Sequence, residues 1–133
     1  MTPYGLDHVA IAVRKIKNHL PLYRTKLGIP LEGITTFKEY GVRIASLKLK
    51  NARVELLEPI GKKSVLAKFL KKRGEALHHV AFKTPGLAKT VASLKQKKLT
   101  WINEKPRRGL HNTRICFLHP SCTRGILLEF VSD

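Results

Sequence analysis

The chain has 133 residues, of which 43% are hydrophobic and 26% charged, so it can bury one core and leaves no room for a multidomain enzyme. It carries 26 Lys and Arg against 9 Asp and Glu, and the formal net charge of +17 favours an anionic partner. No apolar run reaches the ~20 residues of a membrane span, and the N-terminus lacks the pattern of a secretory signal. We therefore expect a cytoplasmic protein that does not enter a membrane.

A repeated segment divides the chain nearly in two. Residues 6–13, LDHVAIAV, return as residues 77–84, LHHVAFKT, at an offset of 71 residues. Both copies alternate as a strand does, which places His8 and His79 on the same face as small alanines. We expect the two imidazoles at equivalent positions, each projecting into space that its neighbours leave unfilled.

A helix and further strands follow each copy in the same order. In the first half the expected helix spans residues 18–27 and the strands span residues 42–49 and 52–59; in the second half the helix spans residues 86–98 and the strands span residues 114–120 and 125–131. Pro21 fits only the first turn of its helix, with Asn18 as the cap and Gly28 as the end. The expected order is βαβββ, twice.

These elements predict an α+β fold of one domain over residues 1–133. Two βαβββ modules, at about residues 5–60 and 76–132, are expected to pair into a cupped, barrel-like mixed β-sheet with the helices outside. A short connecting helix at about residues 64–73, capped by Ser64 and ended by Gly74, is expected to cover one edge of the sheet.

Each module carries one acidic residue in an otherwise apolar strand, Glu55 in RVELL and Glu129 in LLEFV. A buried carboxylate must be compensated, and a divalent cation would compensate both. Two neutral imidazoles and two carboxylates suit Mn, Co, Ni or Zn and leave positions open for substrate or water. The repeat therefore predicts a metal site formed by His8, Glu55, His79 and Glu129.

Two alternatives remain open for these residues. Glu58 lies 71 residues before Glu129 and preserves the LLE triplet, but it faces opposite to Glu55 and directly precedes Pro59, so we favour Glu55. A single strand histidine is more often a hydrogen-bonded core residue than a ligand, and a strand glutamate can face solvent. The repetition of both residues is what favours a metal.

Other candidate groups lie outside this set. Glu39, in FKEYGVR, could lie across the cup of the sheet from the predicted metal site and act as a proton-abstracting base, or it could be a solvated turn residue. His111, in the loop RRGLHNTR, could approach the mouth of the pocket or be an ordinary polar loop residue. Cys116 and Cys122 lack CxxC spacing and are expected to be reduced thiols.

Several longer segments carry a family resemblance. LDHVAIAV, YRTKLG and the terminal LLEF resemble the vicinal-oxygen-chelate superfamily, which includes glyoxalase I and extradiol dioxygenases. The span VELLEPIGKKSVLAKFLKKRGEALHHVAF and the segments EYGVRIASL, INEKPRRGLHN and FLHPSCTRGILLEF resemble the methylmalonyl-CoA epimerases more than any other branch. HPSCTRG lacks the lysine and paired glycines usual after HP, and HN replaces the common HG at His111 and Asn112.

The resemblance implies an isomerase that exchanges the 2R and 2S forms of methylmalonyl-CoA through proton abstraction at C2. It implies metal ligation by His8, Glu55, His79 and Glu129, with Co favoured, and Glu39 as the base. Glu129 at the metal, or a bound water, would return the proton from the other face. A homodimer is implied by analogy with the family.

Two other functions are consistent with parts of the sequence. A glyoxalase-like isomerase or lyase could use the same His and Glu set on another small substrate. A basic nucleic-acid-binding module on an inert version of the fold would explain the charge, although KKSVLAKFLKKR and KQKKL lack interleaved aromatics. Lys38, Arg43, Arg107 and Arg108 are candidates for contact with the CoA tail.

Overall fold

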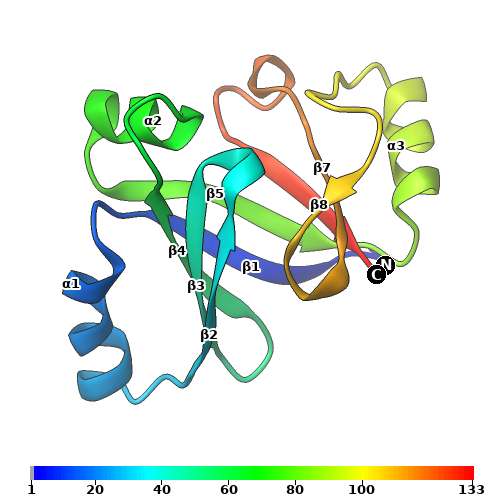
Figure 1. Ribbon diagram of the computed structural model, residues 1–133. Helices are drawn as coiled ribbons and strands as arrows, with labels where there is room; N and C mark the ends of the chain where they lie inside the picture. Colours follow the sequence, from blue (N-terminus) through cyan, green and yellow to red (C-terminus); the bar gives the residue numbers. More distant parts are fainter. Residues whose placement is uncertain (1) are drawn as a thin grey trace. The chain divides into compact units, whose positions relative to one another are not determined.

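The computed structural model describes residues 2–133, and these form two compact units. The N-terminal unit spans His8–His78, and the C-terminal unit spans His79–Asp133 together with the start of the chain up to Asp7. The N-terminal unit combines two α-helices with a mixed sheet and the C-terminal unit combines one with a mixed sheet, as Figure 1 shows, so the predicted α+β class is confirmed. Over residues 2–133 no helix is long and apolar enough to cross a membrane.

The N-terminal unit contains four strands in the order β2-β3-β4-β1. Its elements are β1 (Gly5–Ala12), α1 (Ile16–Leu20), β2 (Leu31–Phe37), β3 (Val42–Lys48), β4 (Arg53–Pro59) and α2 (Val65–Arg73). The unit begins within β1, at His8. β2 pairs antiparallel with β3 and β3 antiparallel with β4, whereas β4 pairs parallel with β1. This parallel pair holds two of the candidate ligands.

The C-terminal unit repeats the arrangement in the order β5-β8-β7-β6. Its elements are β5 (Ala76–Lys83), α3 (Leu87–Gln96), β6 (Arg107–Arg108), β7 (Arg114–Phe117) and β8 (Leu128–Ser132). The boundary with the N-terminal unit falls within β5, at His79. β5 pairs parallel with β8, and β8 pairs antiparallel with β7. The order βαβββ is confirmed in both halves. In each half the first strand after the helix, β2 or β6, comes before the two strands whose residues the sequence predicted.

In each unit one face of the sheet packs against a helix. In the N-terminal unit a buried cluster joins the sheet to α1 and comprises Val13, Ile16, Ala45, Leu47 and Leu56. In the C-terminal unit the cluster joins the sheet to α3 and comprises Leu87, Val91, Trp101, Cys116, Leu118 and Phe130. Full burial of one such aliphatic or aromatic side chain contributes about 1.5–3 kcal/mol. Glu55 and Glu129 lie on the opposite face of each sheet, since each directly precedes a residue of these clusters, Leu56 or Phe130.

The first helix differs from its prediction. It begins at Ile16 rather than Asn18, and its first N–H donates to the Glu58 carboxylate, with 2.8 Å between Ile16 N and Oε1. Pro21 therefore lies inside the helix, where it cannot donate to the preceding turn. The chain continues as a π-helix over Pro21–Lys26, with Leu27 N donating to Leu22 O, and this wider winding accommodates the proline.

The connecting helix agrees with its prediction. The Ser64 hydroxyl accepts a hydrogen bond from Ala67 N at 3.1 Å, and Gly74 ends α2 with φ of 75°. The apolar side of α2 is held by Leu66 and Leu70, each 5% exposed. Ser64 is thus held in place by its hydrogen bond to Ala67 N and by the packing of α2.

Candidate active site

The N-terminal unit places His8 beside Glu55. In the parallel pair of β1 and β4, Ala10 lies opposite Glu55, and His8 precedes Ala10 by two residues on the same face. His8 Nδ1 lies 3.3 Å from Glu55 Oε2, and both residues are 4% exposed. A charged carboxylate at this depth requires a partner, and the imidazole supplies one.

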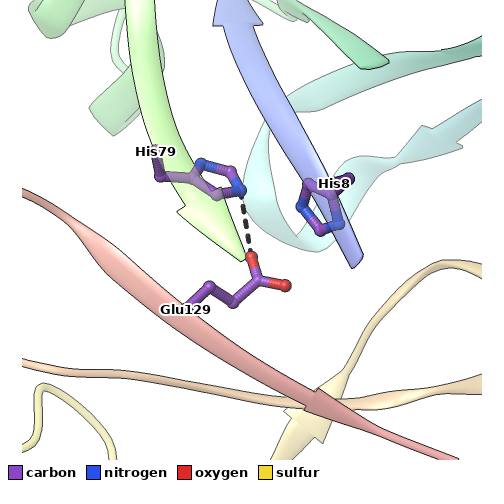
Figure 2. A group of neighbouring side chains, drawn as sticks. All are labelled: His8, His79 and Glu129. Carbon is purple, nitrogen blue, oxygen red and sulfur yellow. Dashed lines mark ion pairs between the residues drawn. The ribbon is translucent and has the colours of Figure 1, made fainter. Parts of the chain in front are cut away.

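The C-terminal unit repeats this pair with His79 and Glu129. Ala81 lies opposite Glu129 in the parallel pair of β5 and β8, and His79 precedes Ala81 by two residues. His79 Nε2 lies 3.1 Å from Glu129 Oε1, the contact drawn dashed in Figure 2. Phe117 stands edge-on to the imidazole with ring centroids 5.4 Å apart, so an aromatic wall covers one side of His79.

The donor set of the two pairs fits a divalent ion. Two atoms bound to one ion at about 2.1 Å lie roughly 3.0–3.4 Å apart, and the two N to O separations are 3.3 and 3.1 Å. The same separations satisfy hydrogen bonds when no ion is bound. Imidazole nitrogen and carboxylate oxygen together are ligands that Mn, Co, Ni and Zn accept.

The registers decide which glutamate corresponds to Glu129. Glu55 and Glu129 lie opposite the equivalent alanines of the two repeats, so they occupy the same position in the two sheets. Glu58 instead binds Ile16 N and the Arg43 guanidinium, with Nη1 3.1 Å from its Oε2. Glu58 on β4 thus binds both the start of α1, through Ile16, and β3, through its ion pair with Arg43.

Glu39 lies in a tight turn between two strands of the N-terminal unit. The 3₁₀ turn Lys38–Tyr40 joins β2 to β3, and Gly41 ends it with φ of 64°. The Phe37 and Tyr40 rings flank the turn with centroids 5.6 Å apart. The backbone that carries the Glu39 carboxylate can therefore adopt fewer conformations than the backbone of a long loop.

The remaining histidines have local structural contacts. His78 stands edge-on to Phe69 at 4.8 Å between ring centroids. His19 Nε2 lies 2.8 Å from Glu75 Oε2, so it binds a carboxylate on the N-terminal unit. His119 Nδ1 contacts Ser121 at the start of a 3₁₀ turn. His111 adopts φ of 54° in its loop.

Both cysteines are free, as the sequence predicted. Burial raises the pKa of the Cys116 thiol, which keeps it protonated and poorly nucleophilic. Cys116 belongs to the apolar cluster under α3. It is therefore a packing residue.

Sequence reasoning missed the residues that surround the two pairs. Phe117 faces His79 because β7 lies beside β8 in the register Phe117 to Glu129. Ser46 lies opposite Glu55 and donates to Glu32, whose carboxylate also accepts from Arg53 Nε at 2.7 Å. Only the strand register reveals these neighbours, since they lie far from the histidines in the chain.

The comparisons with known proteins agree on one family. A family model for the glyoxalase/bleomycin resistance protein/dioxygenase superfamily matches residues 7–117. The chain is 35% identical to the mitochondrial methylmalonyl-CoA epimerase of Bos taurus over 125 residues, 93% of this chain and 71% of that protein. It is 31% identical to the ethylmalonyl-CoA/methylmalonyl-CoA epimerase of Cereibacter sphaeroides over 93% of this chain and 94% of that protein.

The fold of a solved relative agrees as well. A methylmalonyl-CoA epimerase in complex with methylmalonyl-CoA and NH4+ matches with a TM-score of 0.94 and 33% identity, over 99% of this chain and 96% of that chain. The chain therefore belongs to the glyoxalase/bleomycin resistance protein/dioxygenase superfamily and, within it, to the methylmalonyl-CoA epimerases.

Proposed function

We propose that the chain interconverts the 2R and 2S forms of methylmalonyl-CoA by removing and returning the proton at C2. The observation that carries this proposal is the recurrence of one buried His and Glu pair at the same register in both units. Membership of the epimerase family and the similarity to a solved relative bound to methylmalonyl-CoA support the choice of substrate.

The cofactor in this proposal is one divalent ion held by His8, Glu55, His79 and Glu129. Each unit contributes one imidazole and one carboxylate, all of them at most 7% exposed. Two carboxylates cancel the charge of a divalent ion, which reduces the energetic penalty of burying the group. When bound, the ion supplies Lewis acidity that stabilises negative charge on the thioester oxygen. We place Co first among Co, Mn, Ni and Zn on family resemblance.

Glu39 is the base in this proposal. A carboxylate that abstracts a proton must lie within about 2.6–3.2 Å of it, directly or through one water. The turn at Lys38–Tyr40, braced by two aromatic rings, restricts where the Glu39 carboxylate can lie. The Glu39 side chain is exposed, so membership of the epimerase family is what favours a base over a solvated turn residue.

Inversion at C2 also requires an acid on the other face. A single base would return the proton to the face it came from, with retention of configuration. We assign the return step to Glu129 or to a water that it orients, since Glu129 is the other carboxylate of the predicted catalytic set. This assignment gives Glu129 a second role beside its contact with the metal.

The positive charge of the chain suits an acyl-CoA substrate. CoA esters carry phosphates, and the field of a +17 protein draws such anions toward its surface. Residues 59–74 contain no acid, and six cations of this segment are exposed: Lys62, Lys63, Lys68, Lys71, Lys72 and Arg73. Arg43, a sequence candidate for the CoA tail, forms an ion pair with Glu58 and its side chain remains 48% exposed.

We also propose a homodimer. Several large apolar side chains of the N-terminal unit are exposed, among them Leu27 at 59% and Leu77 at 56%. Association of two copies would remove such surface from water. Light scattering across a tenfold dilution series tests the assembly, and a mass of 15.0 kDa throughout would exclude the dimer.

Exchange of the C2 proton with solvent tests the proposed reaction directly. Methylmalonyl-CoA incubated with the protein in D2O is expected to gain deuterium at C2, and a chelator followed by added Co²⁺ is expected to stop and restore the exchange. Absence of exchange in the metal-loaded protein would contradict the proposal. Turnover of a small-thiol hemithioacetal in its place would favour a glyoxalase-like isomerase.

A further inference from the structure

The turn that carries Glu39 lies directly against the start of α2. Gly41 ends the turn in the left-handed region, with φ of 64° and ψ of 39°. A Cβ at position 41 would lie 2.7 Å from the Cβ of Ser64, closer than two such carbons approach in proteins. The backbone conformation therefore favours glycine at position 41, and the approach to Ser64 excludes a side chain there.

Ser64, the residue that a side chain at position 41 would meet, is held by several contacts. Ser64 caps α2 by accepting from Ala67 N, and α2 is packed through buried leucines. The segment that leads from β4 to α2 is bound to the turn as well, because Ile60 N donates to Gly41 O at 2.8 Å. The end of β4, the cap of α2 and the Glu39 turn thus form one connected piece of backbone.

A second glycine shows that left-handed backbone alone does not create such a contact. Gly61 adopts φ of 77°, yet within residues 2–133 no heavy atom lies within 4 Å of a Cβ built on it. A side chain at position 61 would meet open space. The two positions therefore share a positive φ and differ in whether a neighbour lies in the path of the side chain.

We propose that Gly41 is a positioning residue for the catalytic base, because only a residue without a side chain lets the Glu39 turn lie this close to Ser64 at the cap of α2. This inference rests on the role of Glu39 in the proposed function. The first atom of a side chain at position 41 would press against Ser64 and shift the turn that ends there. A misplacement of a catalytic group by about 1 Å costs on the order of 10² in rate, so a small shift has a large effect.

The experiment compares kcat, KM and bound metal in four variants. Gly41→Ala is expected to lower kcat about 10–100-fold while KM and metal content stay at wild-type values. Ser64→Gly removes the opposing Cβ and keeps an acceptable cap, so kcat is expected to remain within about threefold of wild type. The double variant G41A/S64G is expected to recover most of the loss, because the space for the new methyl group is restored.

Gly61→Ala is the matched control for backbone strain. It places alanine at a similar positive φ without a neighbour in the path of the side chain, so kcat is expected to stay near wild type. An equal loss in G41A and G61A, a wild-type kcat in G41A, or a loss that S64G does not relieve would overturn the inference. Should G41A fail to fold, G41A/S64G must fold and be active, and an unfolded double variant would equally overturn it.

A Glu39→Gln background separates this inference from the proposed function. If Gly41 acts through Glu39, G41A is expected to lower kcat no further once Glu39 is replaced. Wild-type kcat in E39Q would remove the proposed base itself. A strong effect of E39Q with a wild-type kcat in G41A would overturn only the positioning role.

Discussion

The carboxylate of Glu58 accepts a hydrogen bond from the backbone N–H of Ile16, with Oε1 2.8 Å from the nitrogen. This bond satisfies a free N–H at the start of α1, a place where a negative charge is favourable. Three residues earlier on β4, Glu55 instead lies beside His8. Two glutamates of one strand thus have different partners, one in a helix cap and the other in the candidate metal site.

Replacement of the two glutamates is expected to separate stability from metal binding. Glu58→Ala leaves a buried N–H and Arg43 without their acceptor, and is expected to lower the free energy of unfolding by about 2 kcal/mol with metal content unchanged. Glu55→Ala is expected to weaken metal binding at least about 10-fold, since even residues behind the ligands have effects of that size. Urea unfolding and metal titration measure the two effects, and the opposite assignment of losses would contradict the account.

The strand face of each candidate ligand could be predicted because strand alternation is local and the two halves repeat. His8 and His79 follow from the shared motif, and Glu55 follows from its face and its distance from Pro59. The start of α1 could not be predicted, because the acceptor for its first N–H is Glu58, 42 residues away in the sequence. Asn18 has the right chemistry for a cap, but α1 already begins at Ile16, whose N–H donates to a distant carboxylate.

The surroundings of the candidate site depend on strand register in the same way. Phe117 meets His79 only because β7 pairs with β8 in one particular register. The contact of Gly41 with Ser64 joins a turn to a helix cap across the intervening β3 and β4. Sequence patterns report which face a residue occupies, whereas these contacts depend on how elements distant in the chain are paired.

Glu39→Gln is expected to lower kcat by about 10²–10⁴, the usual contribution of a positioned general base. Glutamine keeps the shape of the side chain but cannot accept the proton. Metal content and melting temperature are expected to be unchanged, because Glu39 lies on a turn apart from the His and Glu pairs. Steady-state kinetics with metal analysis of the same sample provide the test, and full activity would exclude Glu39 as the base.

Glu75 is expected to make stability depend on pH in the acid range. The backbone N–H of Arg14 and the ring of His19, both bound to Glu75, hold the pKa of its carboxyl below the usual 4.5. A depressed folded-state pKa contributes stability above the unfolded value and loses it as pH falls through the folded value. Glu75→Gln is expected to reduce stability above pH ~5, by less than about 1 kcal/mol because the group is partly exposed.

The difference between wild type and E75Q should therefore shrink as pH falls below about 4.5. Thermal unfolding of both proteins between pH 3 and pH 7 measures it. A difference that grows on acidification would contradict the assignment of Glu75 as the anionic partner of Arg14 and His19.

Salt is expected to slow the reaction with the CoA ester. Screening shortens the range of the attraction between the +17 chain and the substrate phosphates, with a Debye length of about 10 Å at 0.1 M salt. We expect kcat/KM to fall between 0.02 and 0.5 M NaCl on the order of 10-fold, while kcat changes little. A variant with Lys68, Lys71 and Lys72 changed to Gln is expected to show a shallower dependence, and a salt-independent kcat/KM would exclude steering.

The stoichiometry of bound metal tests the central claim, that both His and Glu pairs act on one ion. Metal-free protein titrated with Co²⁺ is expected to bind one ion per chain. H8A/E55Q, which removes the pair of the N-terminal unit, and H79A/E129Q, which removes that of the C-terminal unit, are each expected to lose both the ion and C2 exchange. Two ions per wild-type chain, or one ion retained after either pair is removed, would contradict the account.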